Sequence, residues 1–126
     1  MNGDKLISFI LTVYNKEHLL DKCLKSLKKL SKYKSVKNKF EVIAINDCSS
    51  DRSLKKLKSW KKKIINLRII NNKKNMGKGY SCRSGIESSK GEIIIIQDAD
   101  LEYNPENYKQ LIDPIKFNEA QVVYGS

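Results

Sequence analysis

The chain has 126 residues, 40% of them hydrophobic, and a formal net charge of +11 at pH 7. This length suits one small domain with a buried core, and no apolar run is long enough to span a membrane. The three cysteines stand far apart, which argues against a disulfide framework or a zinc site and predicts free thiols without a disulfide partner. We therefore expect one soluble, cytoplasmic domain over residues 1–126, without a secretory signal peptide.

The positive charge is unevenly distributed along the chain. Residues 1–86 carry 22 of the 25 Lys+Arg and only 6 of the 14 Asp+Glu. Such a field favours anionic partners, namely a nucleotide diphosphate, phospholipid headgroups or nucleic acid. Lysine-rich helix faces are also an ordinary way to fill solvated surface, and for any single lysine cluster we favour that reading.

The first half of the chain alternates strand and helix patterns. Residues 6–13 and 40–46 are apolar, β-branched runs typical of buried strands. Leucines recur at helical spacing between them, and Glu17 lies near the start of that helix, where a negative charge is favourable. A polar turn over residues 47–51 follows the second strand and offers Asp51 as a cap for the next helix.

The second half continues the alternation and defines the predicted fold class. Its segments are a helix with Leu54, Leu57 and Trp60 on its apolar face, a strand at 67–70, a loop at 71–79, a helix at 80–89 with Tyr80 expected in the core, a strand at 93–96, a helix from Asn104 to about Phe117 and a strand at 121–124. We expect an α/β fold with an open, mostly parallel sheet and helices on both faces. The polar turns after the first, second and fourth strands then gather at one edge, where such sheets bind ligands.

The stretch 92–103, EIIIIQDADLEY, carries the strongest chemical signal in the sequence. Its isoleucines are typical of a strand buried on both faces of a parallel sheet. Asp98 and Asp100 follow at the carboxyl end of that strand, and two carboxylates separated by one residue can bind a divalent cation. An acidic turn after a strand is an equally good reading of this stretch taken alone.

Four stretches in order resemble the inverting glycosyltransferases of family 2, which have the GT-A fold. They are ISFILTVYNKE at 7–17, FEVIAINDCSSD at 40–51, NMGKGYSCRSG at 75–85 and IIIIQDADLEYNPE at 93–106. The last of them, with VVYGS at the end of the chain, is most similar to polyprenyl- or dolichol-phosphate mannosyl- and glucosyltransferases. The resemblance covers essentially the whole chain and implies a Rossmann-like fold that binds a nucleotide sugar.

The resemblance also assigns roles to individual residues. Asp98 and Asp100 match the family's Asp-x-Asp and are the implied ligands of Mg²⁺ or Mn²⁺, with Asp98 also contacting the donor. The implied contacts to the rest of the donor are Thr12 and Tyr14 in the base pocket, Asp47 on the nucleobase, Glu17 near the ribose, and Gly77 with Lys78 at the diphosphate. Two positions depart from the usual pattern: Asn46 precedes Asp47 where a second aspartate is common, and Thr12 stands where most members have proline.

The resemblance therefore implies transfer of a sugar from a UDP- or GDP-sugar, with inversion, to an acceptor such as polyprenyl phosphate or a glycan, in cell-envelope polysaccharide or glycolipid synthesis. An enzyme of this kind with a lipid acceptor would lie peripherally at the membrane surface. Family members continue further, so we expect the catalytic base beyond Ser126 and interpret the chain as the N-terminal, donor-binding part, truncated at its C-terminus.

Two alternatives stay open from the residues alone. One is a truncated, non-catalytic nucleotide-binding module of the same fold. The other is a basic nucleic-acid-binding protein that uses residues 22–39 and 52–83. The second ranks last, and we expect no nucleic-acid partner, because the segment lacks interleaved aromatic residues and leaves the carboxylates unexplained.

Overall fold

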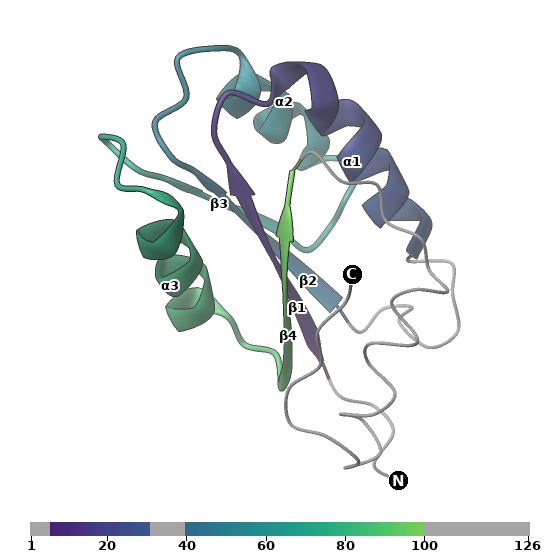
Figure 1. Ribbon diagram of the computed structural model, residues 1–126. Coiled ribbons are helices and arrows are strands. Elements are labelled where there is room, and N and C mark those ends of the chain that lie inside the picture. Colours follow the sequence, from purple (N-terminus) through teal and green to yellow (C-terminus); the bar gives the residue numbers. More distant parts are fainter. Residues whose placement is uncertain (1–5, 31–39, 100–126) are drawn as a thin grey trace, which may run out of the picture.

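The computed structural model describes residues 6–30 and 40–99, which form a parallel sheet with helices on both faces (Figure 1). Along the chain the elements are β1 (Ile7–Val13), α1 (Glu17–Leu30), β2 (Phe40–Asn46), α2 (Ser53–Trp60), β3 (Leu67–Asn71), α3 (Lys78–Ser88) and β4 (Ile93–Asp98). The predicted α/β fold class is confirmed. The helix and strand predicted after residue 103, like Asp100, lie outside the described residues, and none of the described helices is long and apolar enough to cross a membrane.

The four strands lie in the order β3-β2-β1-β4, and each adjacent pair is parallel. In this register Thr12 of β1 pairs with Ile45 of β2 on one side and with Asp98 of β4 on the other. Because all strands point the same way, β1, β2 and β4 end at the same edge of the sheet. The topology thus places the motif residues at the carboxyl edge, as alternating strands and helices predict.

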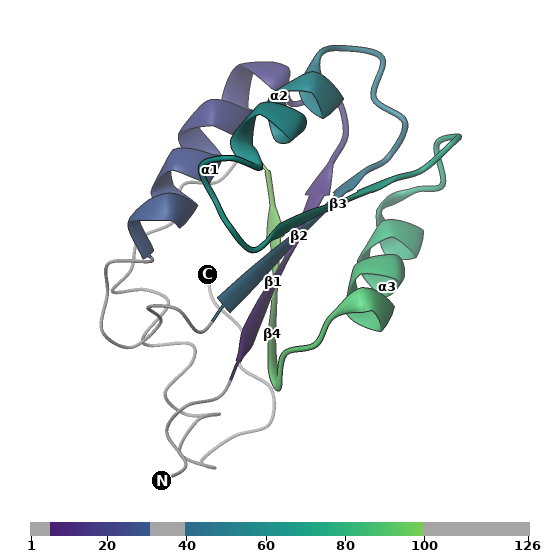
Figure 2. The same ribbon diagram turned by 180° about the vertical axis from the view of Figure 1, so that it is seen from behind.

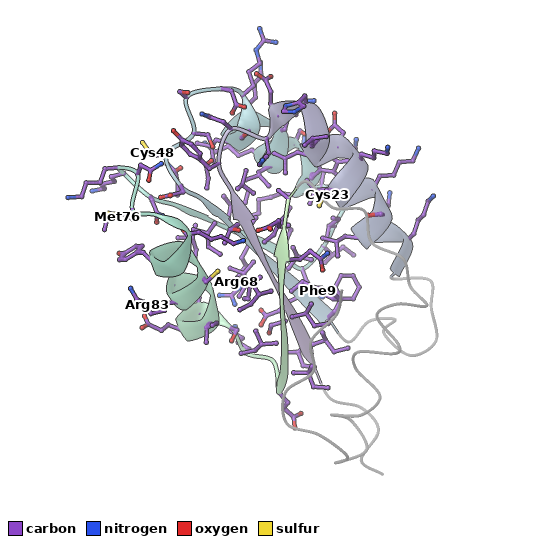
Figure 3. The ribbon with its side chains drawn as sticks, viewed as in Figure 1. Phe9, Cys23, Cys48, Arg68, Met76 and Arg83 are labelled. Carbon is purple, nitrogen blue, oxygen red and sulfur yellow. The ribbon has the colours of Figure 1, made fainter. Side chains whose placement is uncertain are left out.

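The helices sort to the two faces according to the alternation of side chains along the strands (Figures 1 and 2). Phe9 and Leu11 lie in the larger core, which includes the buried leucines of α1 and Leu57 of α2. Ile10, between them in sequence, belongs to a smaller cluster on the α3 side. Figure 3 shows Phe9 and Cys23 on the side of α1 and Arg68 on the side of α3.

Small residues let α3 approach the sheet closely. Ser81 and Gly85 are its buried residues, and a Cβ atom on Gly85 would lie 2.5 Å from Ile10 Cγ2. Tyr80 was expected in the core, and that expectation is wrong: its side chain is 44% exposed. The reason is that the buried side of the helix is set by Ser81 and Gly85, which lie one turn apart, so that Tyr80 falls outside it.

The isoleucine strand is buried on one face only, so the expectation of burial on both faces is wrong for the described chain. Ile93 is buried in the larger core, whereas Ile94 is 38% exposed and Ile96 is 47% exposed. Within the described residues β4 is an edge strand, and α3 packs on β1 and β2. On the α3 side of the sheet, β4 is therefore covered less by α3 than β1 and β2 are.

The buried carboxylate of Glu41 forms a hydrogen-bond network at the end of the sheet opposite to the motif residues. Glu41 accepts hydrogen bonds from Ser8 Oγ at 2.6 Å, from Arg68 Nη2 at 2.8 Å and from the backbone N–H of Lys90 at 2.6 Å. Burial raises the pKa of Glu41, but these hydrogen bonds outweigh it and hold the pKa below its ordinary value. The Ser8 hydroxyl also accepts the N–H of Gly91 at 2.8 Å, so the network anchors the connection from α3 to β4.

Candidate functional site

A cleft of about 370 Å³ opens at the carboxyl edge of the sheet. It lies between the ends of β1, β2 and β4 and the start of α3. The lining residues are Thr12, Val13, Tyr14, Lys16, Asp47, Asn75, Gly77, Lys78, Ser81, Asp98 and Ala99. Its position follows directly from the parallel topology, because residues from three separate motifs meet where their strands end.

Most of the residues that the sequence singled out line this cleft. Thr12 and Tyr14 come from β1 and the loop after it, Asp47 follows β2, Gly77 and Lys78 stand at the start of α3, and Asp98 ends β4. Glu17 does not line the cleft: it begins α1, and its backbone N–H donates to Asp51. Asp100 lies outside the described residues. The binding roles of all these residues remain predictions.

The wall beside Tyr14 is held by hydrogen bonds between the loops that follow β1 and β2. Asn15 adopts a left-handed backbone conformation with φ 50°, which asparagine tolerates better than most residues. Its side-chain Oδ1 accepts the N–H of Ser50 at 2.8 Å, and its own N–H donates to Ser49 Oγ at 3.0 Å. The Lys16 N–H donates to Ser53 Oγ at 2.9 Å, so hydrogen bonds join the loop after β1 both to the loop after β2 and to the start of α2.

Asp51 joins the same two loops by capping two helices at once. Its Oδ2 accepts the N–H of Glu17 at the first position of α1, at 3.1 Å, and its Oδ1 accepts the N–H of Ser53 at the first position of α2, at 2.9 Å. The side chain of Arg52, which occupies the N-cap position of α2, makes no capping hydrogen bond. Asp51 thus precedes the N-cap position of α2 rather than occupying it, but its carboxylate accepts the first N–H group of both helices.

Asp47 holds the opposite wall, the loop over residues 72–77 that leads into α3. Its Oδ1 accepts the N–H of Met76 at 2.7 Å and Asn72 Nδ2 at 3.0 Å, and its Oδ2 accepts the N–H of Gly77 at 2.9 Å. Burial raises the pKa of Asp47, and the three hydrogen bonds more than offset this, so its pKa lies below the ordinary value. Asp47 is thus a buried, ionised carboxylate at neutral pH, with loop donors on both oxygens.

An ion pair spans the cleft between α3 and β4. Lys78 Nζ lies 2.6 Å from Asp98 Oδ1, and both side chains are substantially exposed. Lys78 is the first residue of α3, so its ammonium adds to the positive end of the helix dipole. With Lys16 also in the lining, the cleft favours an anion, while Asp98 offers a carboxylate for a cation.

The described residues supply only part of a divalent metal site. No group of three His, Cys, Asp or Glu side chains comes together within residues 6–30 and 40–99. Asp98 offers a carboxylate, which is the kind of oxygen ligand that suits Mg²⁺ or Mn²⁺. In the structure this carboxylate pairs with the ammonium of Lys78. Its side chain is 43% exposed, so bound phosphate oxygens and water can complete a coordination shell. The residue fits a metal shared with a phosphate ligand.

Sequence reasoning missed three polar residues of the lining, Lys16, Asn75 and Ser81, besides the apolar Val13 and Ala99. Lys16 and Asn75 lie inside motif stretches that were singled out for other residues. Their position within these motifs was therefore the sequence signal that could have predicted a place in the cleft. Ser81 carried no chemical signal, because a small residue on a helix reads as a packing position. It reaches the cleft only because α3 lies so close to β1 and β2.

Comparison with known proteins identifies the relatives of the chain. The family model described as Glycosyl transferase family 2 matches residues 8–126. A dolichyl-phosphate beta-glucosyltransferase from Dictyostelium discoideum is 33% identical over 129 residues, covering 95% of this chain and 39% of that protein. The chain therefore spans less than half of the length of this relative.

Solved structures show the same architecture. The structure of S. aureus TarS 1-349 in complex with UDP-GlcNAc matches 90% of this chain and 32% of that one, with a TM-score of 0.77 and 27% identity. The mannosyltransferase PcManGT from Pyrobaculum calidifontis, in complex with GDP-Man and Mn²⁺, matches 86% of this chain and 31% of that one, with a TM-score of 0.77 and 19% identity. These neighbours are GT-A glycosyltransferases, and the described sheet and helices have that fold.

Proposed function

The chain belongs to glycosyl transferase family 2, and on that premise we propose that its cleft binds the UDP- or GDP-sugar donor of a sugar-transfer reaction. The observation that carries the proposal is the meeting of Asp47, Lys78 and Asp98 in one cleft, from three separate segments. The bound UDP-GlcNAc of TarS supports a nucleotide-sugar donor.

We place the nucleoside at the β1 side of the cleft and the diphosphate at the start of α3. Thr12 and Tyr14 supply one wall of the base pocket, and Asp47 contacts the nucleobase from the opposite wall. Glu17 begins α1 and does not line the cleft, and we retain the proposal that it lies near the ribose of the bound donor. Gly77 and Lys78 then meet the diphosphate, because backbone N–H groups at a helix N-terminus and an ammonium both stabilise phosphate oxygens.

We propose that Asp98, with Asp100 from the same motif, holds Mg²⁺ or Mn²⁺ against the diphosphate. A bound divalent cation supplies Lewis-acid stabilisation of the charge that develops on the leaving diphosphate. Asp98 orients that end of the donor, and Lys78 contributes a second positive charge from the opposite side of the cleft. The presence of Mn²⁺ with GDP-Man in a structure of the same fold supports the choice of metal.

We propose a polyprenyl phosphate or a glycan as the acceptor and inversion as the stereochemical course. The dolichyl-phosphate relative supports the lipid acceptor. An acceptor phosphate is already ionised and is a competent nucleophile, whereas a glycan hydroxyl needs a general base. We expect that base beyond Ser126, in the region that the longer relatives possess. The exposed lysines of α1 and α2 support peripheral contact with an anionic membrane surface.

Calorimetric titration of the chain with UDP- and GDP-sugars in the presence of Mn²⁺ tests the proposal. We expect one of the two to bind at least tenfold more tightly than ADP-glucose, which carries the same diphosphate on another base. Equal affinities for all three nucleotide sugars would contradict a site selective for UDP- or GDP-sugars and would indicate a cleft that binds phosphate without reading the base. Donor turnover on a polyprenyl phosphate, measured with the same preparation, then separates a transferase from a binding module.

A further inference from the structure

The hydrogen bonds of Asp47 are directed at the backbone that leads into α3. Met76 and Gly77, which precede Lys78, both donate their N–H groups to this carboxylate, at 2.7 and 2.9 Å. Figure 3 shows Met76 beside the start of α3. The side chain of Asp47 is buried, and two further hydrogen bonds extend the connection: Asn72 Nδ2 donates to Asp47 and also to Ser81 Oγ, at 3.1 Å.

The geometry at Gly77 shows why this backbone needs an external acceptor. Gly77 has φ +90°, a conformation that L side chains rarely adopt, and a Cβ atom there would have no neighbour within 4 Å. The glycine is therefore required by the backbone turn rather than by lack of space. The turn directs the chain into α3 and leaves N–H groups without helical acceptors, and the Asp47 carboxylate accepts two of them.

Asparagine cannot replace a carboxylate in this position. An asparagine side chain has one acceptor oxygen, and its NH₂ group would face one of the two backbone N–H donors. With the amide oxygen towards Met76, the NH₂ group would face Gly77, whose N–H would keep only its 3.2 Å contact with Asn75 Oδ1, and the turn before Lys78 would loosen. Lys78 is the next residue, so the position of its ammonium opposite Asp98 depends on that turn.

We propose that Asp47 is a positioning residue for the diphosphate: it holds Met76 and Gly77, and through them it places Lys78 and the first turn of α3. The inference rests on the proposed function and adds to it a role that does not depend on the nucleobase. Substitution of a residue that contacts only the base weakens the binding of nucleotides and leaves the affinity for a ligand without a base unchanged. Substitution of a residue that acts through Lys78 weakens the binding of both ligands.

A double-mutant cycle with a ligand that has no base tests this role. Wild type, Asp47→Asn, Lys78→Met and the double variant are titrated with Mn²⁺-pyrophosphate and with the preferred nucleoside diphosphate. We expect Asp47→Asn to weaken both ligands about tenfold, the loss of one charge-assisted hydrogen bond. In the Asp47→Asn variant, the additional change Lys78→Met is expected to weaken pyrophosphate binding by less than a further factor of two, because coupled residues give non-additive losses.

Asp51→Asn is the matched control, because Asp51 also accepts backbone N–H groups but from α1 and α2. It should change pyrophosphate affinity by less than twofold. Hydrogen exchange at the Met76 and Gly77 amides should accelerate in Asp47→Asn and remain unchanged in Lys78→Met. If Asp47→Asn does not fold, Asn72→Ala replaces it, with a twofold to fivefold loss expected for pyrophosphate.

Three results are decisive. Unchanged pyrophosphate affinity in Asp47→Asn, with a change confined to nucleotides, would overturn the positioning role and leave a base contact. Fully additive losses in the cycle would overturn it as well. A wild-type chain that binds neither UDP nor GDP would instead overturn the proposed function, whatever the variants do.

Discussion

Lys78 Nζ lies 2.6 Å from Asp98 Oδ1, which joins the start of α3 to the end of β4 across the cleft. Exposed ion pairs of this kind contribute only about 0.2–1 kcal/mol, so a ligand can separate them at small cost. In the proposed site, a divalent cation would compete with Lys78 for the same carboxylate. A diphosphate that arrives with the cation would offer Lys78 a replacement partner, and we therefore expect the binding of metal and nucleotide to be coupled.

Replacing Lys78 by methionine should therefore shift the two affinities in opposite directions. Mn²⁺ alone should bind about twofold to fivefold more tightly, because the competing ammonium is gone. The nucleotide with Mn²⁺ should bind more weakly, because a phosphate contact is lost. Manganese electron paramagnetic resonance and calorimetry measure the two quantities, and Lys78→Arg, which keeps the charge, is the control. Weaker binding of Mn²⁺ alone in Lys78→Met would contradict the competition.

Glu41→Gln should destabilise the protein by about 1–3 kcal/mol at pH 7, because the single amide oxygen can accept from Ser8 and Lys90 only by turning the NH₂ group towards the donor of Arg68. The folded-state pKa of Glu41 lies below its ordinary value of 4.5, so its contribution is fully present above that pH. The contribution is lost as the pH falls through the folded-state pKa. Urea unfolding at several pH values should thus show the gap between wild type and variant closing upon acidification. A gap independent of pH would refute the role of the ionised carboxylate.

Gly85→Ala should cost about 1–3 kcal/mol, because its Cβ atom would overlap Ile10 Cγ2 at 2.5 Å and Ile45 Cδ1 at 2.8 Å. Gly79→Ala is the matched control in the same helix, where a Cβ atom meets nothing within 4 Å. That change should be stabilising by about 0.5–1 kcal/mol, since alanine is the better helix former. Equal unfolding midpoints for the two variants would show that α3 does not pack on the sheet as described.

Asp51→Ala removes one side chain that caps two helices. Each cap contributes about 0.5–2 kcal/mol, so we expect a total loss of about 1–4 kcal/mol in urea unfolding. Ser50→Ala is the control, because its exposed hydroxyl makes only a 3.3 Å contact with Asn15 Oδ1 among the hydrogen bonds described. A loss in Asp51→Ala no larger than in Ser50→Ala would argue against the double cap.

Much of the fold follows from patterns that are local in sequence. Apolar runs predict β1 and β2, helical leucine spacing predicts α1, and the alternation of elements predicts a parallel sheet with its polar turns at one edge. That last step is what brings Asp47 and Asp98 together in the prediction. Strand order was not needed for it, because every strand of a parallel sheet ends at the same edge.

The features that the sequence does not predict depend on which elements are neighbours. The exposure of Ile96 depends on the extent of α3 over β4, and the exposure of Tyr80 depends on the rotation of α3 about its axis. The double role of Asp51 needs the start of α1 beside the loop after β2. The contacts of Asp47 with the loop before α3 join residues 29 and 30 positions apart, and no periodicity encodes them.

The most direct test of the donor cleft is the dependence of nucleotide affinity on the metal, measured by calorimetry in wild type and in Asp98→Ala. We predict that Mn²⁺ strengthens the binding of UDP or GDP at least tenfold in the wild-type chain, equivalent to about 1.4 kcal/mol of coupling. In Asp98→Ala the dependence on Mn²⁺ should disappear. Binding that is indifferent to the metal in the wild type, or equally metal-dependent in Asp98→Ala, would contradict a metal-assisted diphosphate site at this edge of the sheet.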